Sequence, residues 1–131
     1  MKADEVIEAV KGVIKSHPEI KLAYIFGSQA TGHTGTMSDF DFAFYADEKN
    51  THKLYDLKFA LGDKISRALK TDKVDIIILN LSDSPELKYN IIKDGKLFYC
   101  EEPFKVLIEP RILNEYFDFH DLLARYNLTK A

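Results

Sequence analysis

The sequence of 131 residues contains a single cysteine, Cys100, which excludes a disulfide within the chain and points to a reducing compartment. No apolar run reaches the roughly 18 residues that a membrane-spanning helix needs, and residues 1–5 (MKADE) do not resemble a secretory signal. Repeats, low-complexity segments and linkers are also missing. We therefore expect a cytoplasmic protein without a membrane partner, in which residues 1–131 form one domain.

A basic cluster is missing as well. The chain has 18 Lys and Arg residues against 21 Asp and Glu residues, for a formal net charge of −3, and its lysines are interleaved with acids. Proteins that follow a phosphate backbone usually carry a basic face, so no direct binding of long nucleic acid is expected. A nucleotide held through a metal ion fits this charge, because the metal lets an acidic site bind phosphate.

Hydrophobic periodicity predicts helices over residues 4–16, 51–69, 85–93 and 110–126, and strands over residues 20–26, 39–45, 74–79 and 96–100. The last helix is predicted to begin at Pro110, because proline suits the first turn of a helix rather than its interior. In the strand 39–45, phenylalanines alternate with aspartates and therefore lie on the opposite face. This order predicts an α/β (α+β) fold, a small mixed β-sheet with helices mainly on one face.

A glycine-serine turn and three carboxylates point to phosphate chemistry. Gly27 and Ser28 follow the first strand, where glycine lets a phosphate approach main-chain N–H groups and serine adds a donor. Asp39 and Asp41 share one face of their strand, and their repulsion favours a cation between them. Asp75 is the only charge in the apolar strand 74–79 and joins them if the two strands are neighbours. Because Mg²⁺ prefers a few carboxylates together with phosphates and water, these residues predict a magnesium–nucleotide site.

Each of these parts has an ordinary explanation when it stands alone: a common turn, a solvated strand face and an edge residue. Gly-Ser followed ten residues later by Asp-x-Asp is expected by chance in only about one in a thousand chains of this length, which favours the functional interpretation.

The predicted last helix leaves two alternatives open. Its wide apolar stripe either closes the core or is partly exposed as a protein-binding patch. The stripe consists of Ile112, Leu113, Tyr116, Phe117, Phe119, Leu122, Leu123 and Tyr126.

The spacing of Gly27-Ser28 and Asp39-x-Asp41 resembles the signature of the DNA polymerase β-like nucleotidyltransferase superfamily. The segments 24–32 and 38–43 are similar to its minimal nucleotidyltransferase (MNT) branch, and Val74-Asp75-Ile76 is similar to the strand with the third carboxylate. The segments 85–87, 95–99 and 116–119 are similar to MNT proteins encoded beside HEPN partners. One departure is that many relatives carry a further acid two or three positions after the third carboxylate, where this chain has Ile77 and Ile78.

The resemblance implies a polymerase β-like palm fold and an antitoxin that transfers AMP from ATP to a tyrosine hydroxyl of a HEPN ribonuclease toxin. It also implies that Asp39 and Asp41 hold two Mg²⁺ ions, that Gly27 and Ser28 grip the phosphates, and that Asp75 completes the metal site and helps to deprotonate the hydroxyl. Two alternatives stay open: an antitoxin that inhibits by binding alone, and a stand-alone enzyme that modifies a small molecule. The nucleobase, and assembly as a homo- or hetero-oligomer, are open too.

Overall fold

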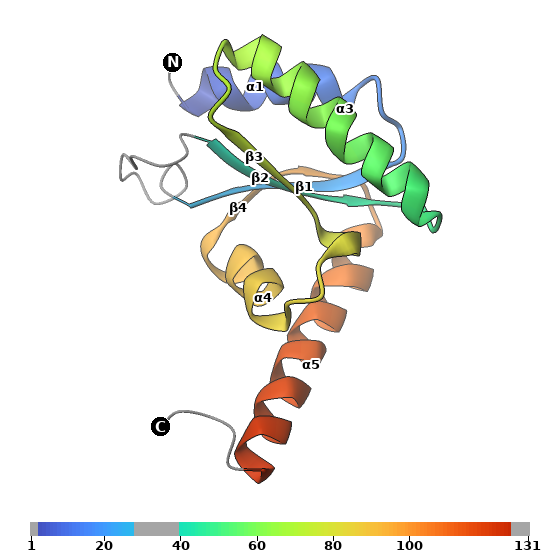
Figure 1. The fold of residues 1–131 in the computed structure, drawn as a ribbon, viewed down its shortest axis with the longest axis vertical. Coiled ribbons are helices and arrows are strands. Elements are labelled where there is room, and N and C mark those ends of the chain that lie inside the picture. The colour runs from blue at the N-terminus through green and yellow to red at the C-terminus, as the bar shows by residue number, and fades with distance from the viewer. Residues whose placement is uncertain (1–2, 28–39, 127–131) are drawn as a thin grey trace.

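The structure is a computed structural model that describes residues 3–27 and 40–126 (Figure 1). Its helices are α1 (Ala3–Ile14), α3 (Thr51–Leu69), α4 (Pro85–Asp94) and α5 (Phe104–Arg125), with a short 3-10 helix η1 (Leu79–Leu81). Its strands are β1 (Ile20–Phe26), β2 (Phe40–Ala46), β3 (Val74–Ile78) and β4 (Lys96–Cys100). Among these helices, none combines the length and the apolar character that crossing a membrane requires. Most of the segment between the two predicted strands 20–26 and 39–45 lies outside the described residues, which on this side end at Gly27 and resume at Phe40.

The four strands form one mixed sheet in the order β3-β2-β1-β4. β1 pairs antiparallel with both β2 and β4, whereas β2 and β3 run parallel. The small mixed sheet predicted from the sequence is therefore confirmed, and β4 is an edge strand. β3 forms the opposite edge, beside β2.

Helices cover both faces of the sheet (Figure 1). On one face, α1 and α3 pack against Phe42 and Phe44 of β2, as the alternation of that strand predicts. On the other face, Ile91 of α4 and Ile108 and Ile112 of α5 form a second core cluster. The sequence predicts helices mainly on one face, and this is wrong because β1 is buried along nearly its whole length. A strand that is apolar on both faces needs a helical layer on each side.

The start of α5 corrects the sequence prediction. The helix begins at Phe104 and contains Pro110 in its interior, instead of beginning there. An interior proline costs about 3 kcal/mol because one backbone hydrogen bond is lost. Ile108 and Ile112 are spaced four residues apart and are both buried against the sheet. Burial contributes about 1.5–3 kcal/mol for each isoleucine, so packing offsets the proline and extends the helix toward its N-terminus.

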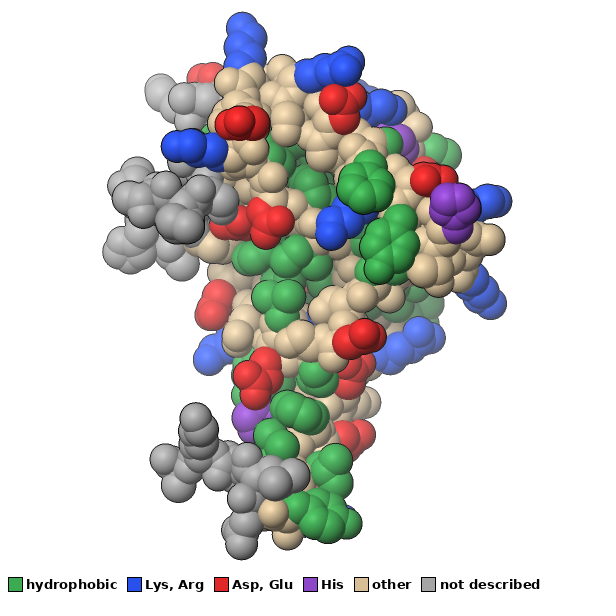
Figure 2. Space-filling view, viewed as in Figure 1, with side chains coloured by type: hydrophobic (Ala, Val, Ile, Leu, Met, Phe, Trp, Pro, Cys, Tyr) green, Lys and Arg blue, Asp and Glu red, His purple; other side chains and the backbone are tan. Residues whose placement is uncertain are grey.

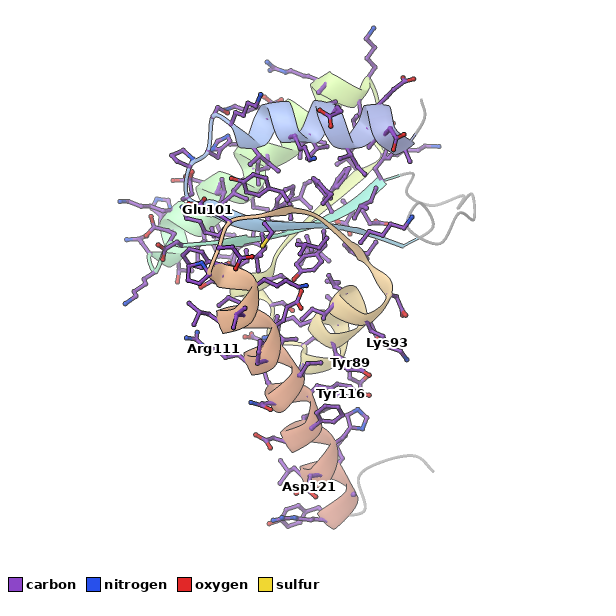
Figure 3. The ribbon with its side chains drawn as sticks, turned by 180° about the vertical axis from the view of Figure 1, so that it is seen from behind. Tyr89, Lys93, Glu101, Arg111, Tyr116 and Asp121 are labelled. Carbon is purple, nitrogen blue, oxygen red and sulfur yellow. The ribbon has the colours of Figure 1, made fainter. Side chains whose placement is uncertain are left out.

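The second half of α5 extends away from the sheet (Figure 1). Within the described part of the chain, no α5 residue after Ile112 is fully buried, and Phe117 and Leu122 are exposed. Tyr116 stacks on Tyr89 of α4, with ring centroids 3.8 Å apart and planes 7° apart (Figure 3). Ile112, the first residue of the stripe, therefore closes the core, whereas Phe117 and Leu122 are exposed, and binding of a partner there stays a prediction.

A hydrogen bond between a strand and a helix joins β1 to α5. The hydroxyl of Tyr24 donates to Oε2 of Glu109 at 2.6 Å, and Tyr24 is only 2% exposed. Burial above all, and then the hydrogen bond and the charge of Glu109, raise the pKa of Tyr24 well above its usual range. The phenol therefore stays protonated in the folded protein at pH values where it ionises in the unfolded chain.

We expect Tyr24→Phe to lower the free energy of unfolding by about 1–2 kcal/mol near neutral pH, because Glu109 loses its donor. Since the folded-state pKa of Tyr24 is raised, its contribution is complete below about pH 10 and declines as the pH rises further. Urea unfolding between about pH 8 and pH 11 should therefore show a steeper loss of stability for the wild type than for Tyr24→Phe. Tyr126→Phe removes an exposed phenol and should follow the wild type. Equal slopes for the wild type and Tyr24→Phe would contradict this linkage.

Candidate active site

The register of the sheet places two of the predicted carboxylates side by side. In the parallel pair of β2 and β3, Asp41 is the Cα partner of Asp75. Partners on neighbouring strands lie about 5 Å apart and direct their side chains to the same face. Ala43 and Ile77, two residues further along the same strands, belong to the core cluster beneath α4 and α5. Asp41 and Asp75 therefore lie on that face, and the predicted neighbourhood of their strands is confirmed.

Gly27 lies directly beside Asp41. Phe26, the last residue of β1, is the Cα partner of Asp41, so Gly27 follows at the end of this ladder. Gly27 has a φ of +75°, and a Cβ added there would overlap Oδ2 of Asp41 and lie 3.2 Å from its Cγ. Both the positive φ and the missing side chain are thus required at this position. The sequence predicts that a phosphate approaches the backbone at Gly27, and this stays a prediction. The side chain that lies next to Gly27 in the structure is the Asp41 carboxylate.

The donor set at this end of the sheet suits a hard divalent cation. Asp75 is exposed and Asp41 is partly buried, so both can be reached by a phosphate or by water. Neighbouring carboxylates repel each other, and the oxygen ligands they offer are those that Mg²⁺ prefers. Within residues 3–27 and 40–126, no group of three or more His, Cys, Asp or Glu side chains could hold a metal ion. Asp39 and Ser28 lie outside the described residues, and their roles stay predictions.

A pocket of about 230 Å³ opens beside Gly27, between the end of β1 and α4. Its walls combine apolar and polar side chains, as binding sites for nucleobases and sugars do. The lining residues are Phe26, Gly27, Leu87, Asn90, Ile91 and Asp94. The sequence does not reveal this pocket, because the pattern of residues 85–94 does not show which face of α4 lies next to Gly27. The helical spacing of the α4 residues was the only available signal.

The class of protein follows from these features together with the family comparison. Residues 8–104 match the family model described as "Polymerase beta, Nucleotidyltransferase", and this range includes Gly27, Asp41 and Asp75. The chain therefore belongs to the polymerase β nucleotidyltransferase family. The superfamily and the fold that the sequence motif implies are confirmed.

Within this family, the chain is similar to a curated protein. The protein adenylyltransferase MntA of Aphanizomenon flos-aquae (strain 2012/KM1/D3) is 34% identical over 94 residues. The aligned segment covers 66% of this chain and 60% of that relative, so the chain spans less than two thirds of the length of MntA. This similarity agrees with the MNT branch indicated by the sequence.

Two solved structures share the fold at low sequence identity. A chain in the crystal structure of a toxin–antitoxin with AMP-PNP matches with a TM-score of 0.76 and 21% identity, covering 92% of this chain and 94% of that one. A chain in the structure of a tri-AMPylated Shewanella oneidensis HEPN toxin in complex with an MNT antitoxin matches with a TM-score of 0.72 and 20% identity. That match covers 96% of this chain and 95% of the other.

Proposed function

We propose that this protein is an antitoxin that transfers AMP from ATP to a tyrosine hydroxyl of a HEPN toxin and thereby neutralises it in the cytoplasm. The observation that carries the proposal is the alignment of Asp41 with Asp75 beside Gly27, in a chain of the polymerase β nucleotidyltransferase family. The adenylyltransferase name of the curated relative supports the reaction. The ATP analogue and the AMPylated HEPN toxin in structures of the same fold support the substrate and the acceptor.

In this proposal, the backbone after Gly27 and the Ser28 hydroxyl hold the β- and γ-phosphates, and Asp39, Asp41 and Asp75 hold two Mg²⁺ ions. When bound, the ions neutralise charge on the triphosphate and polarise its oxygens. The space at Gly27 that Asp41 occupies supports this assignment, because it keeps the carboxylate next to the phosphate-binding turn. The pocket between Gly27 and α4 can receive the nucleoside.

Asp75 accepts the proton of the acceptor hydroxyl in the proposed reaction. The hydroxyl oxygen forms a bond to the α-phosphorus while the bond from that phosphorus to the oxygen bridging toward the β-phosphate breaks. Pyrophosphate leaves with the electron pair of the broken bond, and the proton passes from Asp75 to solvent. Asp75 suits this role because it is exposed on an edge strand, whereas Asp41 lies on β2, between β1 and β3.

Intact-mass spectrometry tests the proposal. The purified protein is incubated with ATP, Mg²⁺ and a HEPN protein encoded by the same genome. We expect the HEPN protein to gain the mass of one or more adenylyl groups, with one pyrophosphate released for each, and EDTA to stop the gain. Co-elution of the two proteins without a mass gain would contradict transfer and favour inhibition by binding alone. Transfer to an aminoglycoside but not to the HEPN protein would favour a stand-alone enzyme.

A further inference from the structure

We propose that the acceptor protein docks an extended segment along the outer edge of β3, in a groove that leads to Asp75. The groove is bordered by α3 along its length and by Leu87 of α4 at the end away from Asp75, and we call it the β3-edge groove. This inference rests on the proposed transferase function and adds where, and in which conformation, the acceptor binds. Four observations carry it: the open edge, the shape of the groove, two exposed aromatic side chains and the position of Asp75.

β3 offers an apolar edge for pairing. In the part of the chain that the structure describes, β3 is hydrogen-bonded to β2 alone. Asp75 is its only charged residue, and the other positions in its sequence VDIII are valine and isoleucine. Natural proteins usually protect sheet edges with lysines, prolines, bulges or a covering segment. An edge with so little protection is a template for a strand from another chain.

Two pockets adjoin along this edge and form the groove. The first, of about 330 Å³, lies at Asp75 and is bordered by Lys58 and Phe59 of α3. The second, of about 140 Å³, continues along Ile77 and is bordered by Tyr55 of α3 and by Leu87 of α4. Lys58 lines both pockets, so they are neighbours. Figure 2, viewed like Figure 1 with β3 toward the viewer, shows hydrophobic side chains gathered across this face.

Two exposed aromatic residues of α3 line the groove. Phe59 is 72% exposed and Tyr55 is 45% exposed. They are four residues apart and therefore share one side of the helix. Single exposed apolar residues are common on protein surfaces. Here two of them border an unpaired apolar strand, and such a combined patch marks a binding surface. Aromatic side chains of this kind often supply much of the binding energy at an interface.

An extended polypeptide is the occupant that this edge fits. Only another backbone presents N–H and C=O groups at the spacing of a β-ladder, and five residues of strand accept a segment about 17 Å long. In the docked segment, the residue paired with Asp75 would have its Cα about 5 Å from the Cα of Asp75 and its side chain on the same face of the sheet. A hydroxyl at that position would therefore lie beside the proposed proton acceptor. The positive charge of Lys58 favours an acidic residue in the same segment.

Phe59→Ala tests the inference in the transfer assay with the HEPN protein. Phe59 is mostly exposed and is not among the proposed nucleotide-binding or catalytic residues, so folding and ATP binding should be unchanged. We expect the KM for the acceptor to rise at least about tenfold, with the KM for ATP and kcat unchanged. Val106→Ala, which removes an apolar side chain that is 68% exposed on α5 and lies outside the stripe that begins at Ile112, is the control and should leave all three constants unchanged. An unchanged acceptor KM in Phe59→Ala would overturn the docking surface.

Hydrogen exchange separates this inference from the proposed function, because it requires no turnover. Addition of the HEPN protein without ATP should slow exchange of the β3 amides at least about tenfold, and Phe59→Ala should remove this protection. Protection of β3 without AMP transfer would support the docking surface and contradict the function. Transfer without protection would overturn the docking surface alone, and the absence of both would overturn both. If β3 is already protected in a dimer of the protein alone, a second copy occupies the groove and the inference is wrong.

Discussion

Asp41→Asn should reduce the rate of AMP transfer at least about a thousandfold while the fold stays intact. Asparagine has nearly the shape of aspartate but lacks its negative charge, so the proposed metal site loses a ligand between the phosphate turn and Asp75. A thousandfold loss corresponds to about 4 kcal/mol of transition-state stabilisation. Initial rates of AMP incorporation into the HEPN protein measure the effect, and thermal unfolding followed by circular dichroism checks the fold.

Asp47→Asn provides the matched control for this substitution. Asp47 is exposed and follows directly after the far end of β2, so the same chemical change is made about one strand length from the site. We expect transfer by Asp47→Asn at the wild-type rate. Full activity of Asp41→Asn would contradict the proposed mechanism, and an equal loss in both variants would show that a change of net charge, not the site, is responsible.

Gly27→Ala should damage both stability and transfer. Alanine at a φ of +75° costs about 1–2 kcal/mol, and the new Cβ would overlap Oδ2 of Asp41. The carboxylate must then move, and a displacement of about 1 Å in an active site can cost about a hundredfold in rate. We therefore expect a loss of about 2 kcal/mol in the free energy of unfolding and at least about a hundredfold slower transfer. Urea unfolding and initial rates measure the two effects.

Gly12→Ala is the control for this second prediction. Gly12 lies in α1, and a Cβ added there meets no heavy atom within 4 Å. Alanine in a helix interior is more stable than glycine by about 0.5–1 kcal/mol, so this variant should be slightly stabilised and fully active. A double-mutant cycle on the free energy of unfolding separates the overlap with Asp41 from the strain of the backbone. In an Asp41→Ala background, Gly27→Ala should lower the free energy of unfolding only by the cost of placing alanine at a positive φ. If Gly27→Ala lowers the free energy of unfolding equally in the wild type and in Asp41→Ala, the Asp41 side chain does not require a glycine at position 27.

The local pattern of hydrophobic residues was sufficient to predict most of the helices and strands. The helix over 51–69 is predicted to the residue, because Leu54, Leu57, Leu61, Ile65 and Leu69 mark one continuous buried face. The strand over 20–26 is bounded by Pro18 on one side and by Gly27 on the other. The start of α5 was predicted wrongly, because the preference of Pro110 is local while the burial of Ile108 depends on the distant sheet.

For the candidate site too, the local sequence predicts the residues, whereas their arrangement depends on long-range pairing of the strands. Residue types and spacing were sufficient to propose Gly27, Asp41 and Asp75 as site residues, and their roles stay predictions. The alignment of Asp41 with Asp75 depends on the parallel pairing of β2 with β3, which no local pattern shows. The β3-edge groove was missed for the same reason, because Phe59 is an ordinary exposed residue until α3 lies beside β3.

The two faces of α3 have a consequence for how this protein can evolve. Its buried leucines hold the helix on the sheet, while Tyr55 and Phe59 are directed away from that core. Mutations at these two positions therefore alter the groove without disturbing the packing beneath it or the carboxylates at its end. In the proposed docking mode, a few surface substitutions would change which acceptor binds while the proposed chemistry at Asp41 and Asp75 stays unchanged.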